Sequence, residues 1–251
     1  MEIISVNNDL VKETVKLQQK KYRTQTGKFL LEGYKAIKEA FDSDIQLEYI
    51  FVNEKHTEEY SFAKNILIIT NDSVLKKIST TDSAPAAIAI GIQKSYDINI
   101  LKDKKKVVLL ENIKDLGNLG TIIRSSLAFG ADAIVLYGGE TVDIYNPKCV
   151  RATVGNLWKI PVLNIKDFED LEKLFKNFNR IATLPRAVKN LKTFSTKLPV
   201  LVMFGSEADG LSEELIKFST ESVKIEMAKT VESLNLASSV SVILYKLFME
   251  G

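Results

Sequence analysis

The sequence predicts an α/β protein with a small N-terminal domain, followed by a larger domain built on a mostly parallel sheet. Short apolar runs alternate with helical patterns along most of the chain, as they do in layered α/β folds. A charge-rich segment, KSYDINILKDKKK at residues 94–106, interrupts this alternation and indicates a linker. The length of 251 residues fits one or two domains, because a domain has about 150 residues.

The first domain is expected at residues 1–95, with a linker at 96–106 and the second domain at 107–251. The pattern in the first domain predicts two helices separated by a turn, three strands, and a short helix after Asp72. The helices are expected at 10–20 and 33–41, the turn at 24–28, and the strands at 47–52, 66–69 and 86–93. This mixture of short elements predicts a small α/β layer.

The second domain alternates more regularly. Its predicted strands are continuous apolar runs, which are typical of strands buried on both faces of a sheet. The strands are expected at 107–110, 133–136, 181–184, 200–204 and 222–225, and the helices at 119–129, 147–154, 168–178, 211–218 and 235–248. This order predicts a mostly parallel sheet with helices on both faces.

Composition excludes several classes of protein. Hydrophobic residues make up 45% and charged residues 26%, which excludes collagen-like, disordered and disulfide-scaffold chains. The single cysteine, Cys149, cannot form an internal disulfide, so we expect a reducing, cytoplasmic location. The single histidine, His56, excludes multi-histidine and Cys/His zinc sites, and we expect no metal. The N-terminus does not resemble a signal peptide, and no apolar stretch approaches the about 18 residues that span a membrane.

The charge distribution is uneven. The whole chain has 34 Lys and Arg against 32 Asp and Glu, a net charge of +2. Residues 10–40 contain eight basic and three acidic residues. A basic first segment on a nearly neutral chain indicates a local contact with phosphates, although a solvated helix face is the commoner explanation of such a stretch.

Ligands of open parallel sheets bind beyond the carboxyl ends of the strands, so the loops that follow the strands are informative. The strand at 107–110 is followed by ENIKDLGNLGTIIR, in which Gly117 and Gly120 allow a tight turn. Asn118 is expected to cap the next helix. Arg124 carries a permanent charge near the start of that helix and suits a phosphate or carboxylate, but a surface arginine is the alternative. The loop is not a GxGxxG motif, so a dinucleotide site is poorly supported.

The strand at 200–204 is followed by GSEADGLSEEL. Gly205 and Gly210 bracket Glu207 in an acidic loop that would repel a phosphate and tolerate a cation. Ser212 is expected to cap the following helix.

The third loop follows the strand at 222–225 and carries Ser233 and Asn235 at the start of the last helix. Capping that helix is the alternative role of these two residues. Because the three loops follow strands of one sheet, we expect them to converge on one edge of it.

These residues resemble a known family. Asn118-x5-Arg124 with Gly120, then Gly205-Ser206-Glu207-x2-Gly210, then Ser233-Leu234-Asn235 resemble the three ordered motifs of the SpoU (TrmH-type) methyltransferases. These are RNA ribose 2′-O-methyltransferases of the SPOUT superfamily. The stretch YNPKCVRATVGNLWKIPV at 145–162 is similar to a segment of the family, and residues 20–41 are similar to its N-terminal substrate-binding domain. The resemblance covers nearly the whole chain.

The resemblance implies a deep trefoil knot at the C-terminal end, although knots are almost absent from proteins in general. It implies S-adenosylmethionine as the cofactor, held by Leu184, Gly205, Ile225, Met227 and Leu234. It also implies a catalytic set of Asn118, Arg124, Glu207, Ser233 and Asn235. Arg124 would act on the ribose hydroxyl through a phosphate and the developing alkoxide, and the two asparagines would fix the geometry. Glu207 would hold Arg124 or face the sulfonium, and Ser233 would position its loop.

The partner implied by the resemblance is RNA, with ribosomal RNA ahead of transfer RNA. Contacts with RNA phosphates are expected from Lys20, Lys21, Arg23 and Lys28. The resemblance also implies a homodimer. The apolar face Val240, Ile243, Leu244 and Leu247 of the last helix fits an interface, although packing in the core explains it equally well.

Two departures from the family pattern leave alternatives open. Glu226 stands where the family usually has Pro, and Lys229 where it often has Gly, so the shape of the loop and the cofactor affinity are in doubt. These departures favour a non-catalytic RNA- or ribosome-binding protein that retains the fold, whereas the intact Asn118, Arg124 and Glu207 argue against it. A nucleotide-handling enzyme with a Rossmann sheet is disfavoured by the missing GxGxxG motif.

Overall fold

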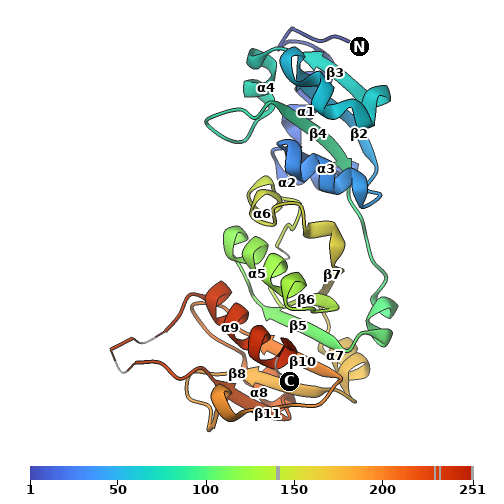
Figure 1. Ribbon diagram of the computed structural model, residues 1–251. Coiled ribbons are helices and arrows are strands. Elements are labelled where there is room, and N and C mark those ends of the chain that lie inside the picture. Colours follow the sequence, from blue (N-terminus) through green and yellow to red (C-terminus); the bar gives the residue numbers. More distant parts are fainter. Residues whose placement is uncertain (140–141, 229, 232, 250–251) are drawn as a thin grey trace. The chain divides into compact units, whose positions relative to one another are not determined.

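The computed structural model describes residues 1–139, 142–228, 230–231 and 233–249 (Figure 1). The chain forms two compact units. The first unit contains Met1–Lys94 and Asp143–Trp158, and the second contains Ser95–Val142 and Lys159–Gly251. Lys229 and Glu232 lie outside the described residues.

The first unit is a four-stranded sheet with the order β1-β4-β2-β3. Its strands are β1(Lys28–Glu32), β2(Leu47–Asn53), β3(Leu67–Thr70) and β4(Ala87–Ile92). Its helices are α1(Asp9–Lys16), α2(Lys20–Thr26), α3(Tyr34–Asp42), α4(Asp72–Ile78) and the 3₁₀ helix η1(Glu54–Ile66). β4 is antiparallel to both β1 and β2, whereas β2 and β3 are parallel. The three predicted strands are therefore present, and β1 is an additional one.

The predicted helix at 10–20 is two helices, because the chain turns between α1 and α2. The carboxyl end of α2 is closed by Gly27, which adopts the left-handed conformation at φ 65°. This glycine directs the chain into β1, so the turn predicted at 24–28 begins only after a further helical segment.

The segment Asp143–Trp158, which contains α6(Pro147–Ala152), packs within the first unit. The ring of Tyr145 lies 4.7 Å from the ring of Phe29. Trp158 Nε1 donates to the carbonyl of Glu39 at 3.0 Å. Burial raises the pKa of the Cys149 thiol in α6 to about 12, so Cys149 is a core residue, as the sequence indicated.

The second unit is a seven-stranded sheet with the order β7-β6-β5-β10-β8-β11-β9. Its strands are β5(Lys106–Glu111), β6(Ala133–Tyr137), β7(Val162–Ile165), β8(Asn179–Thr183), β9(Lys189–Asn190), β10(Val200–Phe204) and β11(Glu221–Lys224). Each of the six strand pairings is parallel. The predicted parallel sheet is confirmed, with β7 and β9 as further strands.

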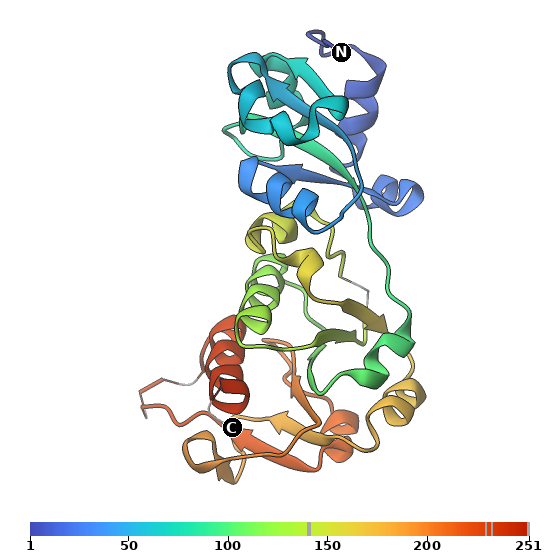
Figure 2. The same ribbon diagram turned by 45° about the vertical axis from the view of Figure 1, so that its right-hand side comes forward.

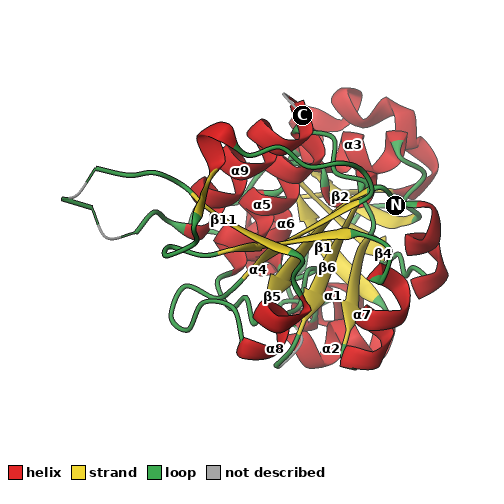
Figure 3. Ribbon diagram, turned by 90° about the horizontal axis from the view of Figure 1, so that it is seen from below, coloured by secondary structure: helices red, strands yellow, loops and turns green. Residues whose placement is uncertain are grey.

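Helices cover both faces of this sheet (Figures 2 and 3). They are α5(Leu116–Ala128), α7(Phe168–Phe175), α8(Glu213–Phe218) and α9(Leu236–Met249). Leu171 of α7 and Leu215 of α8 join the core beside Leu109 and Met203. Helices α5 and α9 pack side by side, and Ser241 Oγ donates to Ser125 Oγ at 2.9 Å.

The segment predicted as a linker contains the 3₁₀ helix η2(Ile98–Asp103), whose Leu101 belongs to the core of the second unit. The domain limits 1–95 and 107–251 stay a prediction, as does the trefoil knot, which the strand order alone does not test. Within the described part of the chain, no helix is long and apolar enough to cross a membrane.

Candidate active site at the carboxyl ends of the strands

A cavity of about 610 Å³ lies at the carboxyl ends of β8, β10 and β11 and at the start of α9. These three strands are neighbours in the sheet, and the carboxyl ends of parallel strands share one edge. Its walls come from residues 183–185, from residues 204–211, from the end of β11 and the residues after it, and from the start of α9. The last two groups are Val223, Lys224, Ile225 and Met227, and Ser233, Leu234, Asn235, Leu236, Ser239 and Ile243. The predicted convergence of the loops after β10 and β11 is therefore present.

The residues predicted to hold a cofactor line this one cavity: Leu184, Gly205, Ile225, Met227 and Leu234. Leu234 is 40% exposed, a large exposure for leucine. An apolar wall that is left open in this way is typical of a site for a flat, largely apolar group. Glu226 is exposed between two of the lining residues.

The loop 205–211 is shaped by a close approach of two glycines. A Cβ atom on Gly205 would lie 1.9 Å from the carbonyl carbon of Gly210. The Gly210 N–H donates to the carbonyl of Ser206 at 3.0 Å, and Gly210 adopts a positive φ of 69°. Only glycine fits at position 205, because the atoms in the way belong to the backbone.

Three of the predicted catalytic residues form a hydrogen-bonded cluster. Asn118 Nδ2 donates to Glu207 Oε1 at 2.6 Å, and Asn235 Nδ2 donates to Asn118 Oδ1 at 3.0 Å. The side-chain amide of Asn118 thus donates to Glu207 in the loop after β10 and accepts from Asn235 at the start of α9. The cluster fixes three separate segments relative to one another, and Glu207 holds Asn118 rather than Arg124.

The N-cap of α5 differs from the sequence prediction. Asp115 is the cap, and its Oδ1 accepts from the backbone N–H of Asn118 at 2.7 Å. The expectation that Asn118 caps this helix is therefore wrong, because Asn118 lies within the first turn, which leaves its amide free to reach Glu207. Asn235 does cap α9, with Oδ1 accepting from Ala237 N at 2.9 Å. Ser212 caps α8 as predicted.

The other two predicted catalytic residues differ in position. Ser233 lines the cavity. Arg124 is exposed on α5 and is not among the described lining residues. It follows Asn118 by six positions, which corresponds to about 9 Å along a helix. A substrate group that contacts Arg124 would therefore lie further along α5 than the cluster of Asn118, Glu207 and Asn235.

The burial of Arg23 removes this residue from the set of predicted RNA contacts. Arg23 is only 1% exposed, and its Nη2 and Nε donate to Asp143 Oδ2 at 2.5 and 2.8 Å. Its Nη1 donates to the carbonyl of Leu17 at 2.7 Å. A buried guanidinium that is fully engaged cannot reach a phosphate, so the structure contradicts the surface position that an RNA contact requires.

The remaining predicted RNA contacts are more accessible. Lys28 is partly exposed and pairs with Glu48 at 2.6 Å. Lys20 and Lys21 are exposed in the first turn of α2, and the Lys21 ammonium lies 5.9 Å from the centre of the Tyr22 ring. Their role in RNA binding stays a prediction.

Two acidic residues near the site were missed by the sequence reasoning. Asp115 holds the start of α5, and the buried Glu111 ends β5. Glu111 stands at the end of an otherwise apolar run in the sequence. Because a buried carboxylate requires a hydrogen-bond partner, this position could have indicated a residue that contacts another segment.

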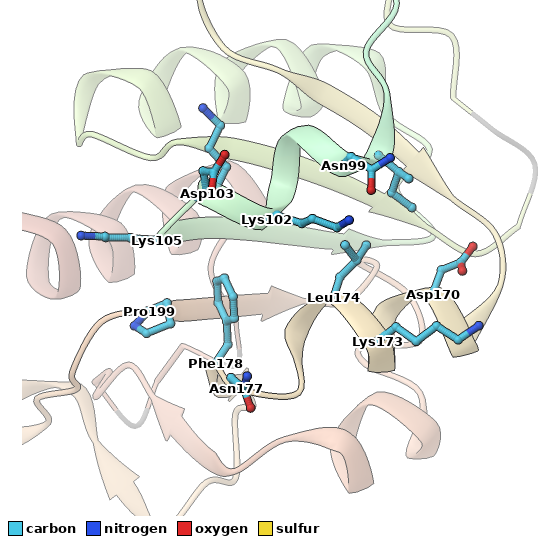
Figure 4. Close-up of a pocket in the computed structure, with 12 residues that line it drawn as sticks. Asn99, Lys102, Asp103, Lys105, Asp170, Lys173, Leu174, Asn177, Phe178 and Pro199 are labelled. Atoms are coloured by element: carbon cyan, nitrogen blue, oxygen red, sulfur yellow. The ribbon is translucent and has the colours of Figure 1, made fainter.

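A second cavity, of about 730 Å³, lies between η2 and α7 (Figure 4). Lys102, Lys105 and Lys173 line it together with Asp103 and Asp170. Lys105 and Lys173 point toward opposite ends of the cavity rather than toward a common centre. This arrangement is typical of solvated surface charges, and the converging polar groups lie at the first cavity.

The described residues contain no group of three or more His, Cys, Asp and Glu side chains that could hold a metal ion. His56 lies in the first unit, where its Nδ1 is 2.6 Å from Glu59 Oε1. The polar side chains at the first cavity are amides, hydroxyls, carboxylates and the ammonium group of Lys224. They suit orientation and charge stabilisation more than general base catalysis by imidazole.

Comparison with known proteins gives two family matches that divide the chain. Residues 105–245 match the model of the SpoU rRNA Methylase family. Residues 8–89 match the model of the MRM3-like substrate binding domain. The first match contains the whole cavity, and the second contains β1, β2, β3 and the first residues of β4.

Individual relatives match over nearly the full length. An uncharacterized tRNA/rRNA methyltransferase of Synechocystis is 30% identical, with 97% of this chain and 92% of that protein covered. A 23S rRNA (guanosine(2553)-2′-O)-methyltransferase of Bacillus subtilis is 28% identical over 98% of both chains. The crystal structure of an AdoMet-bound rRNA methyltransferase from Sinorhizobium meliloti superposes with a TM-score of 0.88 at 28% identity, covering 98% of this chain and 96% of that one.

Proposed function

The chain belongs to the SpoU rRNA methylase family, and from this membership we propose that it transfers a methyl group from S-adenosylmethionine to a ribose 2′-hydroxyl of ribosomal RNA. The observation that carries the proposal is the side-chain hydrogen-bonded cluster of Asn118, Glu207 and Asn235. Glu207 and Asn235 line the cavity, and Asn118 of α5 bonds to both of them.

The residues of the cavity fit the cofactor. Leu184, Ile225 and Leu234 offer apolar surface for an adenine ring. The absence of a Cβ on Gly205 lets the backbone of Gly210 pack against it, which gives the lining loop 205–211 its shape. Glu207 supplies the negative charge that a sulfonium favours. Bound S-adenosylmethionine would supply a methyl group that is already activated.

The chain's own residues would prepare the acceptor. A ribose hydroxyl is a poor nucleophile until it loses its proton. An arginine is a poor base because it stays protonated, so Arg124 would orient a phosphate of the substrate and stabilise the developing alkoxide. The hydroxyl proton would pass to that phosphate and on to water. Asn118 and Asn235 would hold the geometry, and Ser233 would position its loop.

The substrate class follows from the acceptor group. Of the two nucleic acids, only RNA has a ribose 2′-hydroxyl, and the Bacillus subtilis relative is named for 23S rRNA. Lys20 and Lys21 of the first unit would contact phosphates without reading bases. We place the reaction in the cytoplasm, where ribosomal RNA of the bacterial type is found and where the single cysteine would stay reduced.

The proposed enzyme is a homodimer. The face Val240, Ile243, Leu244 and Leu247 is buried within one chain, at 0, 2, 0 and 5% exposure, so it belongs to the core. The opposite side of α9 carries Val242, Tyr245 and Met249, which are exposed at 43, 50 and 59%. These residues are three and four positions apart and therefore share one helix face, which would meet a second copy.

The function is tested by incubating the protein with labelled S-adenosylmethionine and ribosomal RNA that lacks the modification. We expect label on one RNA species at a ribose. Arg124→Ala should reduce transfer by at least about a hundredfold while leaving cofactor binding within about threefold. Lys173→Ala, which removes an exposed charge from the second cavity, is the matched control and should transfer normally.

Two results would count against this proposal. Full activity of Arg124→Ala would remove Arg124 from the reaction. Absence of both cofactor binding and transfer in the unmodified protein would favour the non-catalytic RNA-binding alternative. Binding without transfer on naked RNA would call for assembled ribosomal particles as the next substrate.

A further inference from the structure

Glu111 is a buried acidic residue at the carboxyl end of β5, where the strand leads into the segment that carries Asn118. Its side chain belongs to a residue that is 4% exposed, and its Oε2 accepts from the backbone N–H of Ser212 at 2.7 Å. The two residues are 101 positions apart. A carboxylate is buried at a large desolvation cost unless it is hydrogen-bonded, so this bond is the reason that the acid is tolerated here.

Ser212 is the point at which the cavity loop joins a helix. It directly follows the loop 205–211, which forms one wall of the cavity. Its own Oγ caps α8 by accepting from Leu215 N at 3.3 Å. The other end of the loop is continuous with β10 at Phe204. The Glu111–Ser212 bond therefore fixes the one end of the loop that is not fixed by the sheet.

Glu111 also begins the segment that leads to Asn118. The next residue, Asn112, adopts a positive φ of 52° and its N–H donates to the carbonyl of Tyr137 at 2.9 Å. The chain then reaches Asp115, which caps α5 and holds the Asn118 backbone. A single strand end thus anchors the segment that carries Asn118 and, through Ser212, the loop that carries Glu207.

We propose that Glu111 is a positioning residue for the cofactor cavity. Its carboxylate holds the start of α8, and the loop 205–211 then keeps the shape in which Glu207 meets Asn118 at 2.6 Å. Glu111 is not among the residues that line the cavity, and it acts through the backbone of Ser212. This inference rests on the proposed function only for the identity of the cofactor.

The test compares Glu111→Ala with Glu111→Gln, whose side-chain carbonyl can still accept from the Ser212 N–H. S-adenosylmethionine binding is titrated without RNA, and amide hydrogen exchange of the loop peptide is followed without cofactor. We expect Glu111→Ala to weaken cofactor binding at least about tenfold and to speed exchange in residues 205–212. Glu111→Gln should bind within about threefold of the unmodified protein.

A second pair of variants keeps the test decisive where Glu111→Ala does not fold. Ser212→Pro removes the N–H and places ring atoms against the carboxylate, whereas Ser212→Ala keeps the N–H and removes only the hydroxyl cap. The φ of Ser212 is −63°, which proline accepts. Cofactor affinity should fall with proline and be retained with alanine.

Specific outcomes would overturn the inference. Equal affinity and equal loop exchange in Glu111→Ala and the unmodified protein would show that the bond does not shape the cavity. A loss of thermal stability that Glu111→Gln shares, with no change in cofactor affinity or loop exchange, would make Glu111 purely structural. If the unmodified protein binds no cofactor, the proposed function fails, while the exchange data still decide the role of Glu111.

Discussion

Arg23 and Lys21 are two residues apart in the same basic helix, yet their charges serve different purposes. Arg23 turns inward and is enclosed by Asp143 and the carbonyl of Leu17, whereas Lys21 is exposed to solvent. A guanidinium can satisfy several acceptors in one plane, which makes it the cation best suited to burial. Local charge alone therefore identifies a basic segment but does not identify which of its residues meets a polyanion.

We expect Arg23→Ala to destabilise the first unit rather than to weaken RNA binding directly. Removing one partner of a buried ion pair costs about 3–5 kcal/mol, because Asp143 would remain poorly solvated. The free energy of unfolding is measured by urea denaturation. Lys21→Ala is the matched control and should change it by less than about 0.5 kcal/mol.

The same two variants separate a structural cation from an RNA contact. Lys21→Ala should reduce the slope of log affinity for RNA against log salt by about 1. Arg23→Ala, measured where it is folded, should leave that slope unchanged. A reduced slope with unchanged stability in Arg23→Ala would restore this residue to the RNA-binding surface.

The sequence predicted the site residues that belong to a local motif. It did not predict the residues whose role depends on a partner far away in the sequence. Asn118, Glu207 and Asn235 each lie in a recognisable loop, so the sequence identified them. The bond between Glu111 and Ser212 spans 101 positions, and no local pattern reveals it. The N-cap of α5 was assigned to Asn118 instead of Asp115 because both residue types favour this position and the two residues lie only three positions apart.

At the scale of elements, the loop 205–211 owes its shape to two glycines with different requirements. Gly205 has no room for a side chain, since a Cβ would lie 2.2 Å from Leu211 N as well as against Gly210. Gly210 has open space around its Cα but a positive φ of 69°. One glycine is required by contact and the other by backbone conformation.

This difference predicts unequal effects of alanine. Gly205→Ala must displace backbone and should lower cofactor affinity by at least about tenfold. Gly210→Ala meets no atom and should cost about 1–2 kcal/mol of stability through strain, with a smaller loss of affinity. Calorimetric titration and thermal unfolding measure the two effects. Equal cofactor affinity in Gly205→Ala and the unmodified protein would show that the loop is not a rigid wall.

The strands that the sequence missed are short. β1 contains three buried residues in a row, and such a run is too short to distinguish a strand from a helix. β7 has four residues and β9 has two, so they are strands mainly because neighbouring strands pair with them. In contrast, β5 and β10 are buried along almost their whole length, and their apolar composition alone predicts a central position in the sheet.

At the scale of the molecule, the grouping of Asp143–Trp158 with the N-terminal sheet is the feature that sequence could least predict. This segment lies between β6 and β7 in the chain, and its ion pairs with Arg23 and Glu32 join residues more than a hundred positions apart. Arg151 lies 3.5 Å from the buried Glu32, and Asp143 holds Arg23. Such pairings follow from three-dimensional packing, which neither periodicity nor propensity records.

The exposed stripe on α9 makes the oligomeric state testable. Val242, Tyr245 and Met249 form an apolar face beside α5, and exposed apolar faces of this kind mark interaction sites. Val242→Glu would bury a charge in the proposed interface at a cost of several kcal/mol, roughly a hundredfold or more in the dimer constant. Sedimentation equilibrium should then show a mass near the 28.1 kDa of one chain rather than twice that value.

Val188→Glu is the control for this prediction, because Val188 is 94% exposed and lies in the loop between β8 and β9 rather than on α9. It adds the same charge to another apolar surface position and should leave the dimer intact. A Val242→Glu protein that retains twice the chain mass would exclude this face of α9 as the interface. An unmodified protein that sediments as a single chain would contradict the proposed homodimer.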